Sequence, residues 1–261
     1  MPGSKVINGC EMLRSIDDFL IDVKRRCYGW MELKSRDRVL DVGCGPGLDV
    51  QRIQHLDGLS IDAVGVDLHH GLWKGSWEVA VRQGSAFVAA DAALLPFNEN
   101  TFDVVWADRL LQHVDHPIGT LLEFKRVSKL NGRIVLADSD HTSARIFCDD
   151  KVHGQRLMDF RASTIKNGSA GRMLKAWCEE AGLRVIYNEI IDLDIGSLQF
   201  AIQHTIGVVF RGMGRQISTW REPKSWRTRE LYDDNIAAQP IRSVPVQQQV
   251  PYSFGPQAIG P

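Results

Sequence analysis

The feature that most constrains this chain is a short apolar run that leads directly into a turn of evenly spaced glycines. The run over residues 39–42 suits a strand that is covered on both faces of a sheet. Gly43, Gly45 and Gly47 follow at alternate positions, and glycine adopts positive φ readily and lets backbone N–H groups come close to a ligand. The segment therefore predicts a buried parallel strand with a ligand-binding loop at its carboxyl end.

Acidic residues stand at the ends of three successive predicted strands. Asp41 lies just before the glycine turn, whose G-x-G-x-G spacing differs from the G-x-G-x-x-G spacing of dinucleotide-binding loops. An acid at this place repels a phosphate and attracts a cation. Asp67 ends a second strand over residues 61–67. Asp91 follows a third strand over residues 86–89. Because carboxylates accept hydrogen bonds from a ribose diol or an exocyclic amine, the three ends suit an adenosine that carries a positive, amino-acid-like tail.

Each of these acids also has a simpler structural role. Asp41 could cap the helix that is expected to begin near Pro46, and this role is compatible with ligand binding. Asp67 could be an ordinary exposed loop residue, and Asp91 could cap a following helix. The pattern of residues alone leaves these alternatives open.

Four segments in chain order resemble the motif series of class I S-adenosylmethionine-dependent methyltransferases. They are residues 39–47, 64–68, 90–97 and 102–117. Residues 90–97 and 110–117 are similar to the small-molecule, type 11-like branch, which includes methyltransferases of ubiquinone and menaquinone biosynthesis. The resemblance is firm over residues 35–140. It implies an α/β fold with a Rossmann-like, seven-stranded, mostly parallel sheet and helices on both faces, together with an N-terminal helix and a helical lid insertion.

The resemblance also implies that the loop region binds S-adenosylmethionine and releases S-adenosylhomocysteine as product. In this interpretation Leu68 packs on the adenine ring, the Ala92 N–H donates to a ring nitrogen, and the Ala107 carbonyl lies near the methionine part. The residues implied in cofactor binding are Asp41, Gly43, Cys44, Gly45, Gly47, Asp67, Leu68, Asp91, Ala92, Ala107 and Arg109.

Candidates for a role in catalysis follow the fourth and fifth predicted strands. His113 and His141 lie near the expected active mouth, where a neutral imidazole could take a proton from a phenol or enol. For His113 the alternative is a hydrogen bond to the backbone that shapes the pocket. Arg109 is expected either to pair with a carboxylate of the cofactor or substrate, or to form a structural ion pair with Asp108 or Asp115. The sequence here lacks the Asn/Asp-Pro-Pro-aromatic pattern of enzymes that methylate adenine or glutamine nitrogens, which disfavours that class.

We expect one methyltransferase domain over residues 1–261. Residues 1–35 form a helical cover or simply pack on the core, and residues 36–140 form the cofactor-binding core. Residues 141–168 and about 198–240 are expected to form lid segments, because insertions at this edge of a sheet lie over the ligand. Aromatic residues near the expected lids slightly favour a planar or apolar small substrate, although each such ring is more often part of the core. They are Trp73, Trp77, Phe147, Phe160, Trp220 and Trp226.

Local patterns predict the other elements. Helices are expected over about residues 12–31, 117–131 and 169–181, and strands over 102–106, 133–137, 183–193 and 241–252. The pair Asn131–Gly132 is expected to close the second of these helices. Pro245 and Pro251 restrict the last strand to an edge of the sheet or to irregular pairing.

Composition excludes some functions. A net charge of -1 argues against broad attraction to nucleic acid or anionic lipid, because both require clustered positive charge. The five cysteines form no C-x-x-C pair, so neither a disulfide framework nor a metal site is indicated, and the cytoplasm is the simplest compartment. No apolar stretch reaches the roughly 18 residues that a membrane-spanning helix needs. A monomer and a homodimer are both compatible with the sequence.

These features together predict transfer of a methyl group from S-adenosylmethionine to an oxygen, carbon or nitrogen atom of a small metabolite, in quinone-like or secondary metabolism. Because the sulfonium methyl group is already activated, positioning supplies much of the catalysis, and help from a general base is optional. Two alternatives stay open. One is methylation of a protein or RNA, and the other is a homologue that binds the cofactor without methylating.

Overall fold

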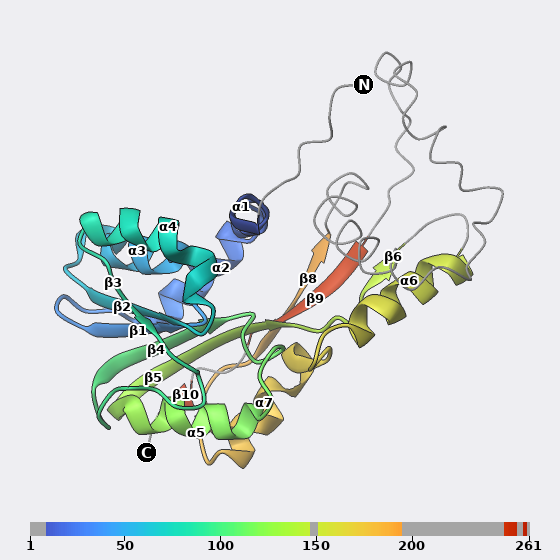
Figure 1. Ribbon diagram of the computed structural model, residues 1–261. Helices are drawn as coiled ribbons and strands as arrows, with labels where there is room; N and C mark the ends of the chain where they lie inside the picture. The colour runs from blue at the N-terminus through green and yellow to red at the C-terminus, as the bar shows by residue number, and fades with distance from the viewer. Residues whose placement is uncertain (1–8, 147–150, 195–247, 255–257, 260–261) are drawn as a thin grey trace, which may run out of the picture.

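The computed structural model describes residues 9–146, 151–194, 248–254 and 258–259, whose strands form one sheet (Figure 1). Its parallel part consists of β1 (Arg38–Val42), β2 (Asp62–Asp67), β3 (Ala86–Ala89), β4 (Phe102–Asp108) and β5 (Ser128–Ser139). These strands lie in the order β3-β2-β1-β4-β5. The order reverses beside β1, which places the loop after β1 at the switch point where open α/β sheets bind ligands.

The other strands pair antiparallel at the far side of β5. They are β6 (Arg145–Ile146), β7 (Arg184–Val185), β8 (Glu189–Asp194), β9 (Gln248–Phe254) and β10 (Ala258–Ile259). β10 lies between β5 and β7, and β9 pairs with β5, β6 and β8. The described residues thus contribute ten strands, where seven were expected. The strand expected over residues 183–193 is divided into β7 and β8, because its two parts pair with different strands.

Helices cover both faces of the parallel sheet. They are α1 (Gly9–Phe19), α2 (Ile21–Met31), α3 (Leu48–Gln54), α4 (His70–Arg82), α5 (Pro117–Val127), α6 (Lys151–Ser163) and α7 (Ala170–Glu180), with a 3-10 turn over Leu56–Gly58. Figure 1 shows α2, α3 and α4 on one face and α5 and α7 on the other, while α6 extends away beside β6. The helix expected over residues 12–31 is divided at Leu20 into α1 and α2.

The core has two halves, because successive side chains of each strand point to opposite faces of the sheet. Val39 and Trp106 point to the side of α2 and α3, whereas Leu40 and Val105 point to the side of α5 and α7. All four residues are fully buried. An apolar strand without polar alternation is therefore buried on both faces, as the sequence predicted.

The pair Asn131–Gly132 does not close α5. This helix ends at Val127, and β5 begins at the next residue. The register between β4 and β5 shifts between Phe102 and Val104, because Phe102 pairs with Ser128 but Val104 pairs with Arg133. Asn131 lies among the residues of β5 that this shift leaves unpaired with β4, and it adopts a φ of +64°. The expectation was wrong because the same dipeptide that ends helices also suits an irregularity of a strand.

The structure describes the expected last strand from residue 248 onward, as β9. β9 contains Pro251, which pairs in register with Asp192 of β8. On its other side β9 pairs with β5 through residues 252–254 and with β6 through residues 248–249, so Pro251 lies where neither ladder continues. This position tolerates a residue without an N–H, and it agrees with the irregular pairing that was expected. Pro245 and the segment 198–240 lie outside the described residues.

Two findings concern other possible roles of the described part. None of its helices combines the length and the apolar character that a membrane crossing requires. Across the same residues, no group of three or more His, Cys, Asp or Glu side chains is placed to hold a metal ion.

Candidate functional site

The glycine loop is held against the end of β2 by its own backbone. The N–H groups of Gly43 and Cys44 both donate to the carbonyl oxygen of Val66, at 2.7 and 3.0 Å. Gly47 has a φ of +86°, and a Cβ atom at this position would lie 2.5 Å from Cε1 of Phe87. The loop therefore requires glycine at 47 both for its conformation and for its close approach to β3.

Asp67 is half-buried at the end of β2 and anchors the same loop. Its Oδ2 atom accepts a hydrogen bond from the Gly45 N–H at 2.9 Å, and its Oδ1 atom accepts one from the His69 N–H at 2.8 Å. Each carboxylate oxygen has a second lone pair, so this acid can still accept hydrogen bonds from a diol. Leu68 beside it is 56% exposed, which leaves its side chain open to contact with a flat ring.

An aromatic pair supports the loop from α4 and β3. The indole Nε1 of Trp77 donates to the Gly45 carbonyl oxygen at 2.8 Å, and its ring stacks on Phe87 with ring centroids 4.9 Å apart. Trp77 is 9% exposed. It therefore belongs to the packing under the loop, which is the core role that the sequence left open beside a substrate contact. Trp77 follows Trp73 by four residues in α4, and this spacing is typical of one buried face of a helix.

Asp41 is almost completely buried below the loop, among other carboxylates. Its exposed fraction is 2%, and its Oδ2 atom has no hydrogen-bond partner within the described residues. Burial, and then the negative charge of Asp49, raise the pKa of Asp41 well above its ordinary value, against the opposing charge of Lys24. No side chain caps α3, so the capping role considered for Asp41 is wrong. A cationic ligand group at this place would pair with the carboxylate and favour its charged form.

A buried lysine pairs with the acids next to Asp41. The Nζ atom of Lys24 lies 2.7 Å from a carboxylate oxygen of Asp49 and 2.8 Å from one of Asp17. It also lies 3.1 Å from Asp108, so α1, α2, α3 and the end of β4 meet at one positive charge. Burial opposes this charge, but the three carboxylates outweigh it and hold the pKa of Lys24 well above its ordinary value.

Asp49 is the centre of this buried network. The hydroxyl of Tyr28 donates to it at 2.6 Å, and Nε1 of Trp106 donates at 3.1 Å. Burial alone would raise its pKa, but the charge of Lys24 and these hydrogen bonds lower the pKa to about 2. The network was not predictable from the sequence, because no local pattern relates Lys24 to an acid 25 residues further along the chain.

The end of β3 is more open than the ends of β1 and β2. Asp91 is exposed, and its Oδ1 atom accepts a hydrogen bond from the Ala93 N–H at 2.9 Å. It caps a local turn, since no helix begins there. Ala92 is 7% exposed, and Ala107 in β4 is 2% exposed. Because both side chains are buried, only the backbone N–H and carbonyl groups of these two residues could contact a ligand.

Arg109 follows β4 in a left-handed backbone conformation, with a φ of +54°. Its N–H donates to the carbonyl oxygen of Ala137 at 2.7 Å, and its Nε atom lies 3.2 Å from Oδ2 of Asp108. Of the two ion pairs considered from the sequence, the one with Asp108 is present. Asp115 pairs instead with Lys166, at 2.6 Å.

The two candidate histidines lie near Arg109 but in different surroundings. His113 is exposed, and partial desolvation of its ring, followed by the charge of Arg109, lowers its pKa. His141 is 6% exposed, and its Nε2 atom lies 2.6 Å from Oε1 of Gln112. Burial, and then the charge of Arg161, lower the pKa of His141 to about 3. Both rings are therefore neutral at pH 7, and His141 is held in place by a side-chain partner.

Asp138, in the last part of β5, was not singled out from the sequence. It is 1% exposed and accepts hydrogen bonds from the N–H groups of Ser139 and Gln112, at 2.8 and 3.1 Å. Burial raises its pKa to about 7, although the two donors oppose this shift. An acid that follows an apolar strand was the signal used for Asp41, Asp67 and Asp91, and it applies to this residue as well.

Comparison with known proteins shows what this part of the chain is similar to. Residues 40–136 match the family described as methyltransferase domain. An uncharacterized methyltransferase of Schizosaccharomyces pombe is 30% identical over 162 residues, which are 57% of this chain and 57% of that protein. A demethylmenaquinone methyltransferase of Renibacterium salmoninarum is 36% identical over 104 residues, which are 40% of this chain and 42% of that protein. The chain thus spans about half the length of these two relatives.

A solved structure extends the likeness of fold to most of the chain. Phosphoethanolamine N-methyltransferase 2 of Haemonchus contortus, in complex with S-adenosyl-L-methionine, matches with a TM-score of 0.54 and 15% identity. The match covers 94% of this chain and 52% of that one. Residues 40–136 are thus similar to methyltransferase domains, and the fold of the chain is similar to that of a methyltransferase. The resemblance seen in the motif series is therefore confirmed, and residues 40–136 are the part of the chain that carries it.

Proposed function

We propose that this chain binds S-adenosylmethionine at the carboxyl ends of β1, β2 and β3 and transfers its methyl group to a small metabolite. The observation that carries the proposal is the buried Asp41 carboxylate, whose Oδ2 atom has no hydrogen-bond partner in the described part of the chain. This acid lies below the glycine loop of a methyltransferase domain. The amino group of the methionine part is the cation that such a carboxylate requires, so the residues present fit the cofactor.

The other strand ends receive roles in this proposal from their chemistry. Asp67 accepts from the ribose hydroxyls with its free lone pairs, and the exposed side chain of Leu68 covers the adenine ring. Asp91 accepts from the adenine amine, and the Ala92 N–H donates to a ring nitrogen. The backbone of the loop over residues 43–47 approaches the methionine part, because its glycines leave no side chain in the way.

Arg109 and Ala107 complete the proposed cofactor contacts after β4. The Ala107 carbonyl lies near the methionine part, and the Arg109 guanidinium pairs with the methionine carboxylate while it keeps its contact with Asp108. This arrangement balances charge, because Asp41 takes the ammonium end and Arg109 takes the carboxylate end of the same amino-acid tail.

The catalytic task of the chain is mainly one of positioning. When bound, S-adenosylmethionine supplies a methyl group that its sulfonium has already activated. The residues around the loop orient the cofactor, and the site must hold the nucleophile in line and exclude water. The acceptor atom is an oxygen, a carbon or a nitrogen of the metabolite.

A small substrate is favoured over a macromolecule. One relative is a demethylmenaquinone methyltransferase, and the net charge of this chain, -1, argues against broad electrostatic attraction to RNA. We place the substrate in quinone-like or secondary metabolism on this ground. The buried free thiols of Cys27, Cys44 and Cys178 suit a reducing compartment such as the cytoplasm.

One labelling experiment tests the proposal. The purified chain is incubated with S-adenosylmethionine that is labelled in its methyl group and with a cell metabolite extract, and binding of the cofactor is measured separately by calorimetry. We expect label in a small molecule. Label in protein or RNA would select the macromolecular alternative, and binding without transfer would select a non-methylating homologue. Absence of binding at saturating cofactor would contradict the proposal.

An Asp41→Asn variant tests whether the buried Asp41 carboxylate contributes to cofactor binding. It keeps the size of the side chain but removes the charge that pairs with the ammonium group. We expect its cofactor affinity to fall by about 10- to 100-fold, which corresponds to the roughly 1.5–3 kcal/mol of a charged hydrogen bond. Asp37→Asn, at the opposite end of the same strand, is the matched control.

A further inference from the structure

A hydrogen-bond chain at the carboxyl end of the sheet fixes the orientation of one amide group. The Nε2 atom of Gln112 donates to the carbonyl oxygen of Arg109 at 3.1 Å. The Oε1 atom of the same amide therefore faces His141, whose Nε2 atom lies 2.6 Å away. Gln112 is 6% exposed, and its own N–H is held by Asp138, so the amide has little freedom to turn.

This orientation decides which nitrogen of His141 carries the proton. An amide oxygen can only accept a hydrogen bond, so Nε2 of the ring must be the donor. A neutral imidazole then has its lone pair on Nδ1. The ring is kept neutral by its burial, which lowers the pKa to about 3. His141 thus presents an acceptor atom with a defined direction.

The Nδ1 acceptor has no use in the fold itself. It is buried and has no hydrogen-bond partner within the described ranges of the chain. Leaving such a buried acceptor without a hydrogen bond is unfavourable. The backbone on either side is well fixed, since the His141 N–H donates to the Gly168 carbonyl oxygen at 2.7 Å. The unsatisfied atom is therefore a property of the side chain and not of a loosely placed loop.

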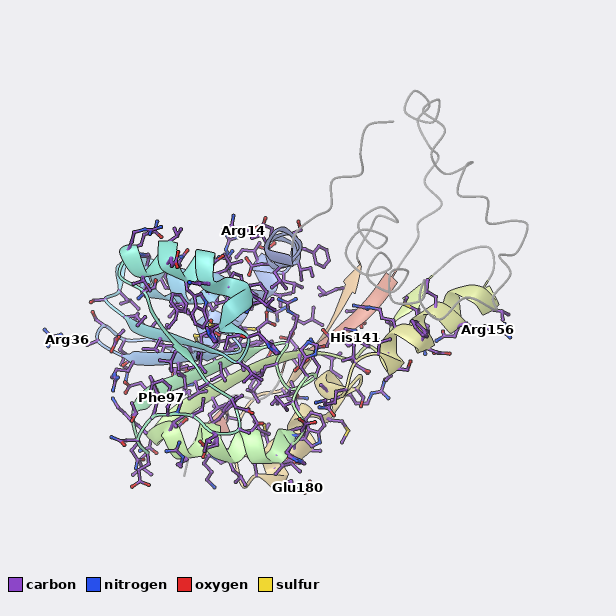
Figure 2. The ribbon with its side chains drawn as sticks, in the orientation of Figure 1. Arg14, Arg36, Phe97, His141, Arg156 and Glu180 are labelled. Carbon is purple, nitrogen blue, oxygen red and sulfur yellow. The ribbon has the colours of Figure 1, made fainter. Side chains whose placement is uncertain are left out.

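The position of His141 connects this atom to the proposed active site. Figure 2 shows His141 just beyond the carboxyl end of the parallel sheet, toward α6, and Arg36 at the opposite end of the sheet. The Gln112 amide bonds both the Arg109 carbonyl oxygen and the His141 ring, so the residues that follow β4 and β5 share one neighbourhood. Substrates of open α/β sheets approach from this edge.

We propose that Gln112 holds His141 in one tautomer so that Nδ1 accepts a hydrogen bond from a hydroxyl group of the methyl acceptor. His141 is then the residue that touches the substrate, and Gln112 is its positioning residue. The inference rests on the proposed function and deepens it, because it selects an alcohol, phenol or enol oxygen among the possible acceptor atoms.

The geometry requires a hydroxyl for a simple reason. Nδ1 without a proton can only accept, so it binds a substrate group that carries a hydrogen and leaves the lone pairs of that oxygen free for attack. As the oxygen–methyl bond forms and the methyl–sulfur bond breaks, the hydroxyl proton passes to Nδ1. It is released from there to water, because the burial of the ring disfavours its charged form. The products are the methyl ether, the neutral thioether and one proton.

The tautomer is tested first, by a measurement that does not depend on turnover. Nitrogen NMR of the full chain labelled at histidine reports which ring nitrogen is protonated. For His141 we expect a proton on Nε2 and a signal that stays constant between pH 5 and 8. In Gln112→Met the amide acceptor is lost, so a mixture of tautomers is expected. A proton on Nδ1 in the wild-type chain, or titration near pH 6.5, would overturn the proposal.

The substrate contact is tested by two replacements of the same ring. In His141→Gln the new amide reaches the place of Nε2 but offers nothing at Nδ1, whereas in His141→Asn an amide oxygen can take the place of Nδ1. With labelled cofactor and metabolite extract, we expect transfer to fall by about 10²- to 10⁴-fold in His141→Gln and clearly less in His141→Asn. Cofactor affinity by calorimetry is expected to be unchanged in both, and His116→Gln serves as a control at an exposed histidine.

The outcomes separate this inference from the proposed function. If the wild-type chain binds no cofactor, the proposed function fails and this inference fails with it. If label enters a small molecule at carbon or nitrogen, the proposed function stands and this inference fails. Equal transfer by His141→Gln and the wild-type chain would also refute it. Should His141→Gln not fold, the transfer rate of Gln112→Met relative to wild type decides in its place, with the expected loss again specific to turnover and absent from cofactor binding.

Discussion

At the scale of single residues, Asp67 both shapes the loop and is proposed to bind the ribose. In Asp67→Asn one amide nitrogen would face the N–H of Gly45 or His69, which are both donors. We expect cofactor affinity to fall by about 10- to 100-fold, as the loss of charge-assisted hydrogen bonds of roughly 1–3 kcal/mol implies. Calorimetry with S-adenosylmethionine measures this. Asp62→Asn changes a carboxylate at the other end of β2 and is expected to bind normally, and equal affinities of the two variants would refute the ribose assignment.

The buried Asp138 carboxylate makes stability depend on pH. Burial raises its pKa from the ordinary 3.8 to about 7, so between these values the folded chain holds a proton that the unfolded chain has released. Its contribution to stability is complete below about pH 4 and is lost as the pH rises through about 7. We expect the free energy of unfolding of the wild type, relative to Asp138→Asn, to decrease by on the order of 2–4 kcal/mol from pH 4 to pH 8. Urea titrations at several pH values measure the difference, and a difference that is constant with pH would contradict it.

At the scale of elements, Lys24 fixes the two N-terminal helices to α3 and to the end of β4. Lys24→Met leaves the carboxylates of Asp17, Asp49 and Asp108 buried without their shared cation. We expect the free energy of unfolding to fall by about 3–5 kcal/mol, the usual effect of removing one partner from a buried ion pair. Arg25→Met is the matched control, because Arg25 on the same helix is exposed and its pair with Asp22 is worth less than about 1 kcal/mol. Similar denaturant midpoints for both variants would show that the cluster does not hold the helices.

The same elements show what a sequence can and cannot predict about the site. Asp41, Asp67 and Asp91 were found because each follows an apolar run, and this is a local signal that the structure places at the ends of β1, β2 and β3. Lys24 could not be distinguished from a surface lysine, since its partners come from three other elements. The pair Asn131–Gly132 is typical both of a helix end and of an irregularity in a strand. Only the pairing of β4 with β5 decides between the two.

At the scale of the whole molecule, the parallel half of the sheet was predictable and the antiparallel half was not. Apolar runs predicted the strands β1 to β5, and the helices α3, α4 and α5 connect strands that are neighbours in the sheet. The pairing of β7, β8, β9 and β10 depends on contacts between distant parts of the chain, such as Ile191 with Tyr252. No local pattern of residues specifies such partners. The sequence therefore predicts one strand over residues 183–193, although its two parts pair with different strands, β10 and β9.

The same distant pairing predicts how the chain responds to truncation. β9 pairs with β8 along six residue pairs, from Glu189 with Phe254 to Asp194 with Gln249, and it also covers the last residues of β5. A chain that ends at residue 247 would expose these strand edges, which destabilises the sheet and favours aggregation. Of the described elements, a chain that ends at residue 254 loses only β10. We expect the shorter chain to melt roughly 10 °C or more below the longer one, as a loss of several kcal/mol implies for a domain of this size. Calorimetric scans of both truncations and the full chain test this, and equal melting temperatures would mean that β9 does not stabilise the sheet.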